Sequence, residues 1–175
     1  MPLTHLVERP LDAALFRGVP GAPAGVVTAA AFLHDAHALA RALPDAAHLV
    51  NLCRDRYAFT VAFAAALLRG QACLVPGDAS AARLAALGVQ FPASTAAVDR
   101  PDPTIPLPCS VVRPTGAGAS TDNPVLPSGR LAAIVFTSGS TGTPVAHCKL
   151  WGALVARSHA AAEQLALDVA EPCTI

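Results

Sequence analysis

Short apolar runs alternate with segments that carry helix signals between residues 28 and 88, and this alternation limits the fold more than any other feature of the chain. An apolar run of four or five residues between turn residues is typical of a buried strand. Strands that alternate with helices indicate βαβ units and a parallel sheet. The expected order is helix 28–43, strand 48–52, helix 55–69, strand 72–75 and helix 81–87. The predicted fold class is therefore α/β with a largely parallel sheet.

Residues that start and stop helices stand at the ends of these segments. Thr28 and Ser80 can cap a helix through their hydroxyl groups, and Asp55 suits the positive end of a helix dipole. Three residues that end helices follow: Pro44, Gly70 and Gly88.

In two stretches the apolar residues follow no regular spacing. Residues 1–27 are rich in Pro and Gly, and we expect an extended lead-in that runs over the surface. Residues 92–129 hold many of the 16 prolines, and only 109–113 is strand-like. We interpret 92–129 as a long connecting loop. The expected organisation is a lead-in, 1–27, followed by an incomplete domain, 28–175, in which 131–167 carries a strand, a loop and a helix.

Composition excludes several classes of protein. The chain is 53% hydrophobic and 14% charged with a formal net charge of +0, which is unlike a disordered chain or a basic nucleic-acid binder. The apolar stretch at 58–68 is shorter than the 20 or so residues that cross a membrane, and residues 1–10 do not resemble a signal peptide. We expect a cytoplasmic protein without a membrane span. The five cysteines form no CxxC pair, so no metal site is predicted.

The segment 131–144 carries the strongest functional signal. An apolar run, 131–136, has strand length, and eight Ser, Thr, Gly and Pro residues follow it. Gly139 and Gly142 let the backbone approach a ligand, and successive amides in such a turn form an anion-binding concavity. Hydroxyl donors come from Ser138, Ser140, Thr141 and Thr143. A loop at the carboxyl end of a parallel strand is where α/β sheets bind ligands. These features favour a polyphosphate; the alternative is a turn built from turn-forming residues.

The order of residues in this loop is specific. It is not the phosphate loop of P-loop NTPases, because no lysine follows Gly142, and it does not match GxGxxG either. The stretch Phe136-Thr-Ser-Gly-Ser-Thr-Gly-Thr-Pro144 resembles the signature loop of the adenylate-forming superfamily, which includes acyl-CoA synthetases, adenylation domains of peptide synthetases, and luciferases. A second stretch, 51–76, with Arg69-Gly70 before a strand and a proline, is similar to an early segment of the same family. The resemblance covers roughly residues 28–170.

This resemblance implies an acid–thiol ligase fold and activity. Family members join a carboxylic acid to ATP, release pyrophosphate, and pass the acyl group to the thiol of CoA or of an acyl carrier protein. The cofactors implied are ATP and Mg²⁺. The residues that would hold the β- and γ-phosphates are Thr137, Ser138, Gly139, Ser140, Thr141, Gly142 and Thr143.

The loop departs from the family pattern at one position. The family usually has a lysine right after the proline, where this chain has Val145. Lys149, expected at the start of the helix 149–167, is predicted to supply the charge, with a solvated helix-start residue as the alternative. His147 is the other nearby basic group and could contact phosphate, although a single loop histidine is more often merely exposed.

The family's segments for adenine, magnesium, acyl group and catalytic lysine lie downstream of this loop, so no catalytic residue is assigned. We therefore expect the N-terminal part of an acyl- or aryl-acid activating ligase, inactive by itself. The alternative is a non-catalytic α/β module that binds phosphate or a partner chain.

Overall fold

The computed structural model describes residues 2–137, 145–168 and 170–175. Within these ranges, six strands form a central sheet in the order β10-β9-β5-β4-β6-β7. Neighbouring strands from β9 to β7 are parallel, and β10 is antiparallel to β9. The strands are β4 (His48–Asn51), β5 (Ala72–Val75), β6 (Ser94–Val98), β7 (Cys109–Val111), β9 (Leu131–Thr137) and β10 (Val145–Leu150). The predicted α/β class with a largely parallel sheet is confirmed.

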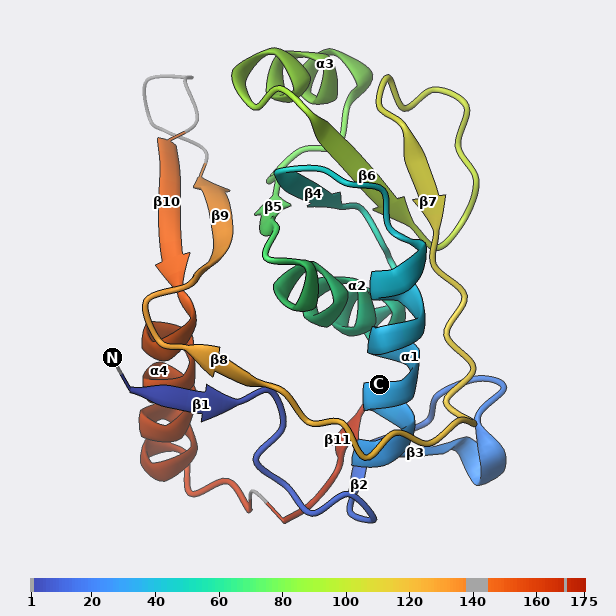
Figure 1. The fold of residues 1–175 in the computed structure, drawn as a ribbon, viewed down its shortest axis with the longest axis vertical. Helices are drawn as coiled ribbons and strands as arrows, with labels where there is room; N and C mark the ends of the chain where they lie inside the picture. The colour runs from blue at the N-terminus through green and yellow to red at the C-terminus, as the bar shows by residue number, and fades with distance from the viewer. Residues whose placement is uncertain (1, 138–144, 169) are drawn as a thin grey trace.

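Helices cover both faces of this sheet (Figure 1). The helices are α1 (Ala29–Ala42), α2 (Arg56–Arg69), α3 (Ala81–Gln90) and α4 (Trp151–Gln164). Successive strand residues point to opposite faces. Accordingly, Leu49 and Cys73 pack in one core with α1 and α2, whereas Val50 and Leu74 pack in a second core with α3. The molecule is a three-layer sandwich around β4 and β5, whose side chains are almost all buried.

The predicted caps fix the helix starts. Thr28 Oγ1 accepts a hydrogen bond from Ala31 N at 3.2 Å, and Asp55 Oδ1 accepts one from Ala58 N at 2.7 Å. Helix α2 ends where Gly70 adopts φ 71°, a left-handed conformation that glycine reaches without strain. Three early elements, α1, β4 and α2, thus follow from local signals in the sequence.

Helix α3 is longer than predicted. The sequence placed its end at Leu87 because Gly88 follows, but the helix continues to Gln90. A Cβ at Gly88 would lie 3.1 Å from Leu107 Cδ2, so this glycine allows close packing of the helix. A glycine inside a helix costs about 1 kcal/mol relative to alanine, which the packing of α3 on the sheet outweighs.

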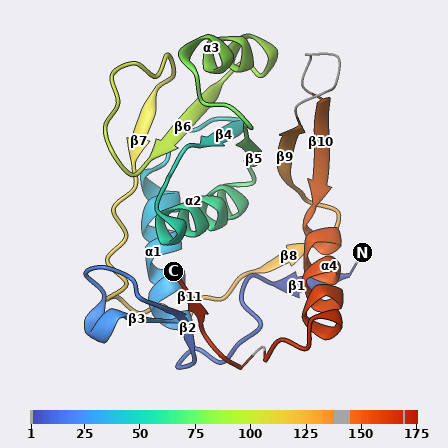
Figure 2. The same ribbon diagram turned by 180° about the vertical axis from the view of Figure 1, so that it is seen from behind.

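The segment after the predicted phosphate loop was predicted wrongly. The sequence indicated one helix over 149–167, whereas 145–150 forms strand β10 and the helix α4 begins at Trp151 and ends at Gln164. Seen from behind, β9 and β10 stand side by side and α4 continues from β10 (Figure 2). Strand β9 would otherwise be an edge with unpaired backbone groups, and pairing with β10 satisfies them.

The stretch 92–129 contains more structure than the single strand expected at 109–113. Strand β6 is buried along its whole length between β4 and β7. Alanine is depleted in strands, so the sequence of β6 carried little signal, and pairing on both sides overrides this weak propensity. Strand β8 (Val125–Pro127) also lies in this stretch.

The first 27 residues are part of the fold, whereas the sequence predicted a segment running over the surface. Val19 and Val27 are buried in the core shared with α1 and α2. Strand β1 pairs antiparallel with β8, while β2 pairs antiparallel with β3 and parallel with β11. These elements are β1 (Leu3–His5), β2 (Ala14–Arg17), a 3-10 turn (Pro23–Gly25), β3 (Val26–Thr28) and β11 (Cys173–Thr174).

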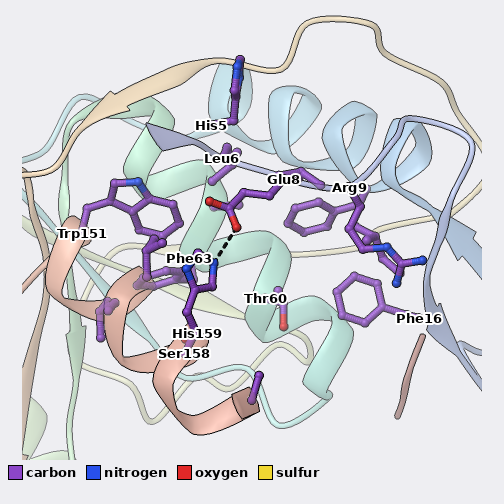
Figure 3. Close-up of a pocket in the computed structure, with 17 residues that line it drawn as sticks. His5, Leu6, Glu8, Arg9, Phe16, Thr60, Phe63, Trp151, Ser158 and His159 are labelled. Carbon is purple, nitrogen blue, oxygen red and sulfur yellow. Dashed lines mark hydrogen bonds and ion pairs between the residues drawn. The ribbon is translucent and has the colours of Figure 1, made fainter. Parts of the chain in front are cut away.

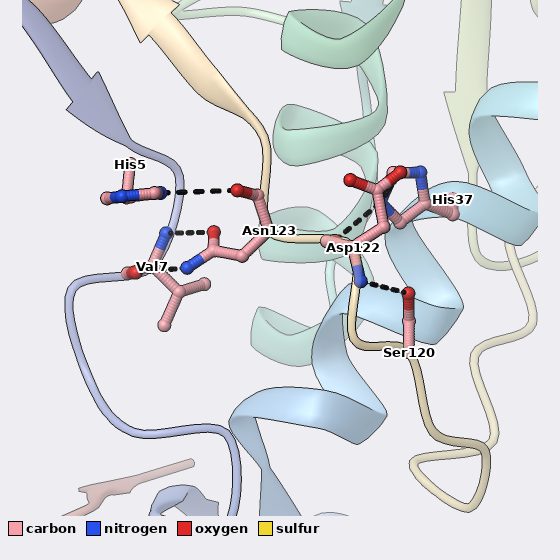
Figure 4. Close-up of polar contacts among 6 residues, drawn as sticks. All are labelled: His5, Val7, His37, Ser120, Asp122 and Asn123. Carbon is pink, nitrogen blue, oxygen red and sulfur yellow. Dashed lines mark hydrogen bonds and ion pairs between the residues drawn. The ribbon is translucent and has the colours of Figure 1, made fainter.

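Polar contacts fasten the start of the chain to the segment before β8 (Figure 4). The Asn123 amide donates to Val7 O at 2.7 Å and its oxygen accepts from Val7 N at 3.1 Å, as a paired strand would. His37 on α1 contacts Asp122 O at 2.9 Å, and His5 contacts Asn123 O at 3.2 Å. One asparagine side chain thereby extends the β1–β8 pairing to Val7.

Candidate functional site

The carboxyl ends of the parallel strands meet at one edge of the sheet, and the predicted phosphate loop leaves this edge. Its first residue, Thr137, is the last residue of β9 and is exposed. The predicted loop residues 138–143 lie outside the described residues. The sequence placed the loop directly after a buried strand, and β9 is that strand.

Acidic side chains order the turns that leave the neighbouring strands at this edge. Asp99, after β6, accepts hydrogen bonds on Oδ2 from Arg54 N at 3.0 Å and Asp55 N at 2.7 Å, at the start of α2. Partial burial alone would raise the pKa of Asp99, but these backbone hydrogen bonds outweigh it and lower the pKa. Asp78, after β5, accepts from Ser80 N and Ser80 Oγ, which lowers the pKa of Asp78. The edge thus holds carboxylates that are fixed by backbone contacts.

A cavity of about 300 Å³ opens between the turns that follow β4, β5 and β6. Its wall combines apolar residues with charged ones of both signs. The residues that line it include Leu52, Arg54, Ala79, Asp99 and Arg100. A crevice at this edge is the usual ligand position in an open α/β sheet.

The hairpin formed by β9 and β10 brings a histidine to the base of the predicted loop. Thr137 lies opposite Val145, and His147 lies opposite Val135. His147 Nε2 is 3.3 Å from Thr137 Oγ1, and both side chains are exposed. The sequence alone favours an ordinary exposed histidine at position 147, because nothing in it predicts the strand that aligns His147 with Thr137.

Lys149 lies farther from the loop than expected. It is half-buried in β10 opposite Ala133, not on the first turn of a helix. At a rise of roughly 3.3 Å per strand residue, its Cα lies about 13 Å along the strand from that of Val145, and that of His147 about 7 Å. The predicted phosphate contact of Lys149 stays a prediction, and the geometry does not favour it over His147.

A larger cavity, of about 580 Å³, lies away from this edge, between α2, α4 and the segment that follows β1 (Figure 3). Its wall is largely apolar and includes Phe16, Phe63 and Trp151. At its side, His159 Nε2 is 2.7 Å from Glu8 Oε2, which joins α4 to the start of the chain. The larger cavity shares no lining residue with the cavity at the carboxyl edge of the sheet, so the two are separate.

The described part of the chain offers neither a cluster of metal ligands nor a membrane-spanning helix. No group of three or more His, Cys, Asp or Glu residues there could hold a metal ion. No helix there is both long and apolar enough to cross a membrane.

Solved structures of CoA ligases and CoA synthetases, and of a protein with adenylation and PCP domains, share this fold. The resemblance predicted from the loop is therefore confirmed at the level of the fold. Protein-family models and curated protein sequences gave no match to the chain.

Three solved structures illustrate the similarity. A malonyl-CoA ligase with methylmalonyl-CoA and AMP bound shares 23% identity over 90% of this chain, with a TM-score of 0.69. O-succinylbenzoate CoA synthetase from Bacillus subtilis, in complex with ATP and a magnesium ion, shares 14% identity over 90%, with a TM-score of 0.67. An NRPS protein with adenylation and PCP domains shares 27% identity over 71%, with a TM-score of 0.51.

The chain matches only part of each of these proteins. It spans 34% of the malonyl-CoA ligase, 45% of the O-succinylbenzoate CoA synthetase and 27% of the NRPS protein. The activities of those whole proteins are therefore only proposals for this chain.

Proposed function

We propose that this chain is the N-terminal part of an adenylate-forming ligase that activates an acyl or aryl acid. In this proposal, residues 28–175 are an incomplete adenylation domain, and the lead-in 1–27 packs against it. The observation that carries the proposal is the position of the predicted phosphate loop, which leaves the carboxyl end of β9 in a fold shared with a synthetase bound to ATP and magnesium.

The loop residues 137–143 would hold the β- and γ-phosphates of ATP through amides and hydroxyl groups. Thr137 fits this role, because its exposed hydroxyl stands where the loop begins. Bound ATP with Mg²⁺ would supply the adenylyl group that activates the acid, with pyrophosphate as the leaving group, and the protein's part is to position the nucleotide with fixed donors. A basic side chain near the loop, predicted at Lys149, would complement the phosphate charge.

The substrate class follows the structural neighbours, which include CoA ligases and a protein with adenylation and PCP domains. We propose a carboxylic acid as substrate and CoA or an acyl carrier protein as the thiol acceptor. The chain would bind nucleotide without completing the reaction, since the resemblance places the catalytic segments downstream. The cytoplasmic location and the absence of a nucleic-acid partner stay predictions from the sequence.

Calorimetric titration of the chain with MgATP tests the proposal. The expected result is binding that Thr141→Ala weakens by about 10-fold, as the loss of a hydrogen bond to a charged group would. Gly139→Val should weaken it further, because a branched side chain closes the approach of the backbone. Ser158→Ala, on α4 beside the larger cavity, is the control. Absence of MgATP binding by folded protein would refute the proposal.

Carboxylate-dependent ATP–pyrophosphate exchange tests whether the chain binds nucleotide without completing the reaction. We expect no exchange with any acid of a fatty and aryl panel, although MgATP binds. Exchange that disappears in the Gly139 and Thr141 variants would mean that the chain catalyses adenylation by itself.

A further inference from the structure

We propose that the larger cavity, between α2, α4 and the segment that follows β1, is a binding site for an uncharged aromatic or aliphatic small molecule. All of its lining residues belong to the described part of the chain (Figure 3). The cavity lies apart from the edge that the predicted phosphate loop leaves, so this inference does not depend on nucleotide binding.

Small side chains on two helices leave the space open. Thr60 and Ala64 lie one turn apart on α2, Ser158 and Ala162 lie one turn apart on α4, and all four line the cavity. Residues four apart share one face of a helix. Neither helix therefore offers a large side chain at these positions to fill the space between them. The hollow thus follows from the sequences of the two helices.

Large apolar side chains form much of the remaining wall. Phe16, Phe63 and Leu154 are only partly buried there, and Trp151 is 9% exposed. An apolar cavity of about 150 Å³ can hold one benzene molecule. By this measure, the volume of about 580 Å³ suits a ligand of roughly 15–20 non-hydrogen atoms. Both the volume and the apolar wall are typical of sites for small molecules.

The charged residues of the wall already have partners. Glu8 Oε2 lies 2.7 Å from His159 Nε2, and Arg9 donates from Nη1 to Glu171 O at 3.4 Å. About half of each side chain of the Glu8–His159 pair is in water, with 49% of Glu8 and 58% of His159 exposed. A carboxylate that entered beside Glu8 would lose water next to a like charge. The wall therefore favours an uncharged ligand.

Fluorescence titration with the uncharged probe N-phenylnaphthylamine tests the site. We expect saturable binding of a single probe per chain. Trp151 is the only tryptophan of the chain and lies in the wall, so its emission should fall as the bound probe accepts its energy. Decanol should displace the probe, whereas decanoate should need a concentration at least about 10-fold higher. Stronger displacement by decanoate would overturn the assignment to an uncharged ligand.

Substitutions that fill the cavity test its position. Ala162→Phe places a ring in the space and should weaken probe binding by at least about 10-fold. Ser158→Phe, one turn earlier on the same face of α4, should act in the same direction. Ala161→Phe is the matched control, because this exposed alanine is not part of the wall, and its affinity should stay within about twofold of the unaltered chain.

Two outcomes would overturn the inference. One is an equal effect of Ala161→Phe and Ala162→Phe on probe binding, and the other is the absence of saturable binding by the folded, unaltered chain. Titration of the same protein with MgATP separates the two proposals, since either site can fail while the other binds its ligand.

Discussion

Asp35 is a buried carboxylate that joins three parts of the molecule. It is 6% exposed on α1, and it accepts hydrogen bonds from Tyr57 Oη at 2.7 Å, Gly116 N at 2.7 Å and Thr115 Oγ1 at 3.3 Å. Burial and the contact with Asp35 raise the pKa of Tyr57, so this tyrosine stays a neutral donor. Asp35 thereby fixes the long connection before β8 against α1 and α2.

Replacing Asp35 should cost more stability than replacing its partner. Asp35→Ala leaves the Tyr57 hydroxyl and the Gly116 amide buried without an acceptor, and we expect a loss of about 3 kcal/mol in the free energy of unfolding. Tyr57→Phe removes one donor from a carboxylate that keeps two others, and about 1 kcal/mol is expected. Urea denaturation measures both, with exposed Asp12→Ala as the control. Equal losses would contradict this account.

Asp99 should make the start of α2 sensitive to acid. Because its pKa is lowered in the folded chain, its contribution to stability is present above the ordinary value of 3.8 and is lost as the pH falls through the lowered value. Asp99→Asn should therefore melt at a lower temperature than the unaltered chain at pH 7. This difference should shrink in acid. A difference in melting temperature that is the same at pH 7 and pH 3 would contradict the assignment.

At the scale of the elements, the sequence predicted those whose signals are local. Helices α1 and α2 start at the residues expected, because a side-chain cap and an apolar face act within a few residues. Strands β6 and β10 were missed, because their propensities are weak and pairing with distant strands determines them. Helix α4 was expected too early and too long for the same reason.

In the candidate site, too, local features could be predicted from the sequence and contacts between distant residues could not. The position of Thr137 at a strand end could be predicted, since the apolar run and the Ser/Thr/Gly loop adjoin in sequence. The contact between Thr137 and His147 could not, because it requires the β9–β10 register. Asp99 was missed as well, since it binds the turn before α2 from a position more than 40 residues away.

The β1–β8 pair should depend on Asn123. These strands pair over only three residues each, so the two hydrogen bonds between the Asn123 side chain and Val7 are a large share of what holds them. Asn123→Ala should speed hydrogen exchange of the Val7 amide and of β1 by at least about 10-fold, in line with the loss of one to two hydrogen bonds. Exchange in β4 should not change. Protection of Val7 that is unaffected by the substitution would show that the strands hold without it.

At the scale of the whole molecule, the reactivity of the cysteine thiols depends on how tightly the sheet and its helices pack. Cys53 and Cys73 are buried, and burial raises the pKa of each thiol to about 12. The exposed cysteines are Cys109, Cys148 and Cys173. Burial and the charge of Asp102 also raise the pKa of Cys109.

A thiol reagent at pH 8 should therefore label the folded chain in a fixed order. Cys148 and Cys173 should react first and Cys109 more slowly, because the thiolate is the reacting species. Cys53 and Cys73 should react only in denaturant, and peptide mass spectrometry identifies each site. Rapid labelling of all five cysteines without denaturant would mean that the core around β5 is open.

Strand β1 pairs with a strand more than 100 residues later in the chain, since Leu3 pairs with Pro127, and Phe16 of β2 pairs with Cys173. A ribosome adds roughly 5–20 residues per second, so on the order of 10 s separates the synthesis of β1 from that of β8. During this interval β1 has no strand to pair with, while β2 and β3 can pair with each other and β4, α2 and β5 can already pack together. Strand β1 therefore stays exposed in the growing chain until β8 has been made.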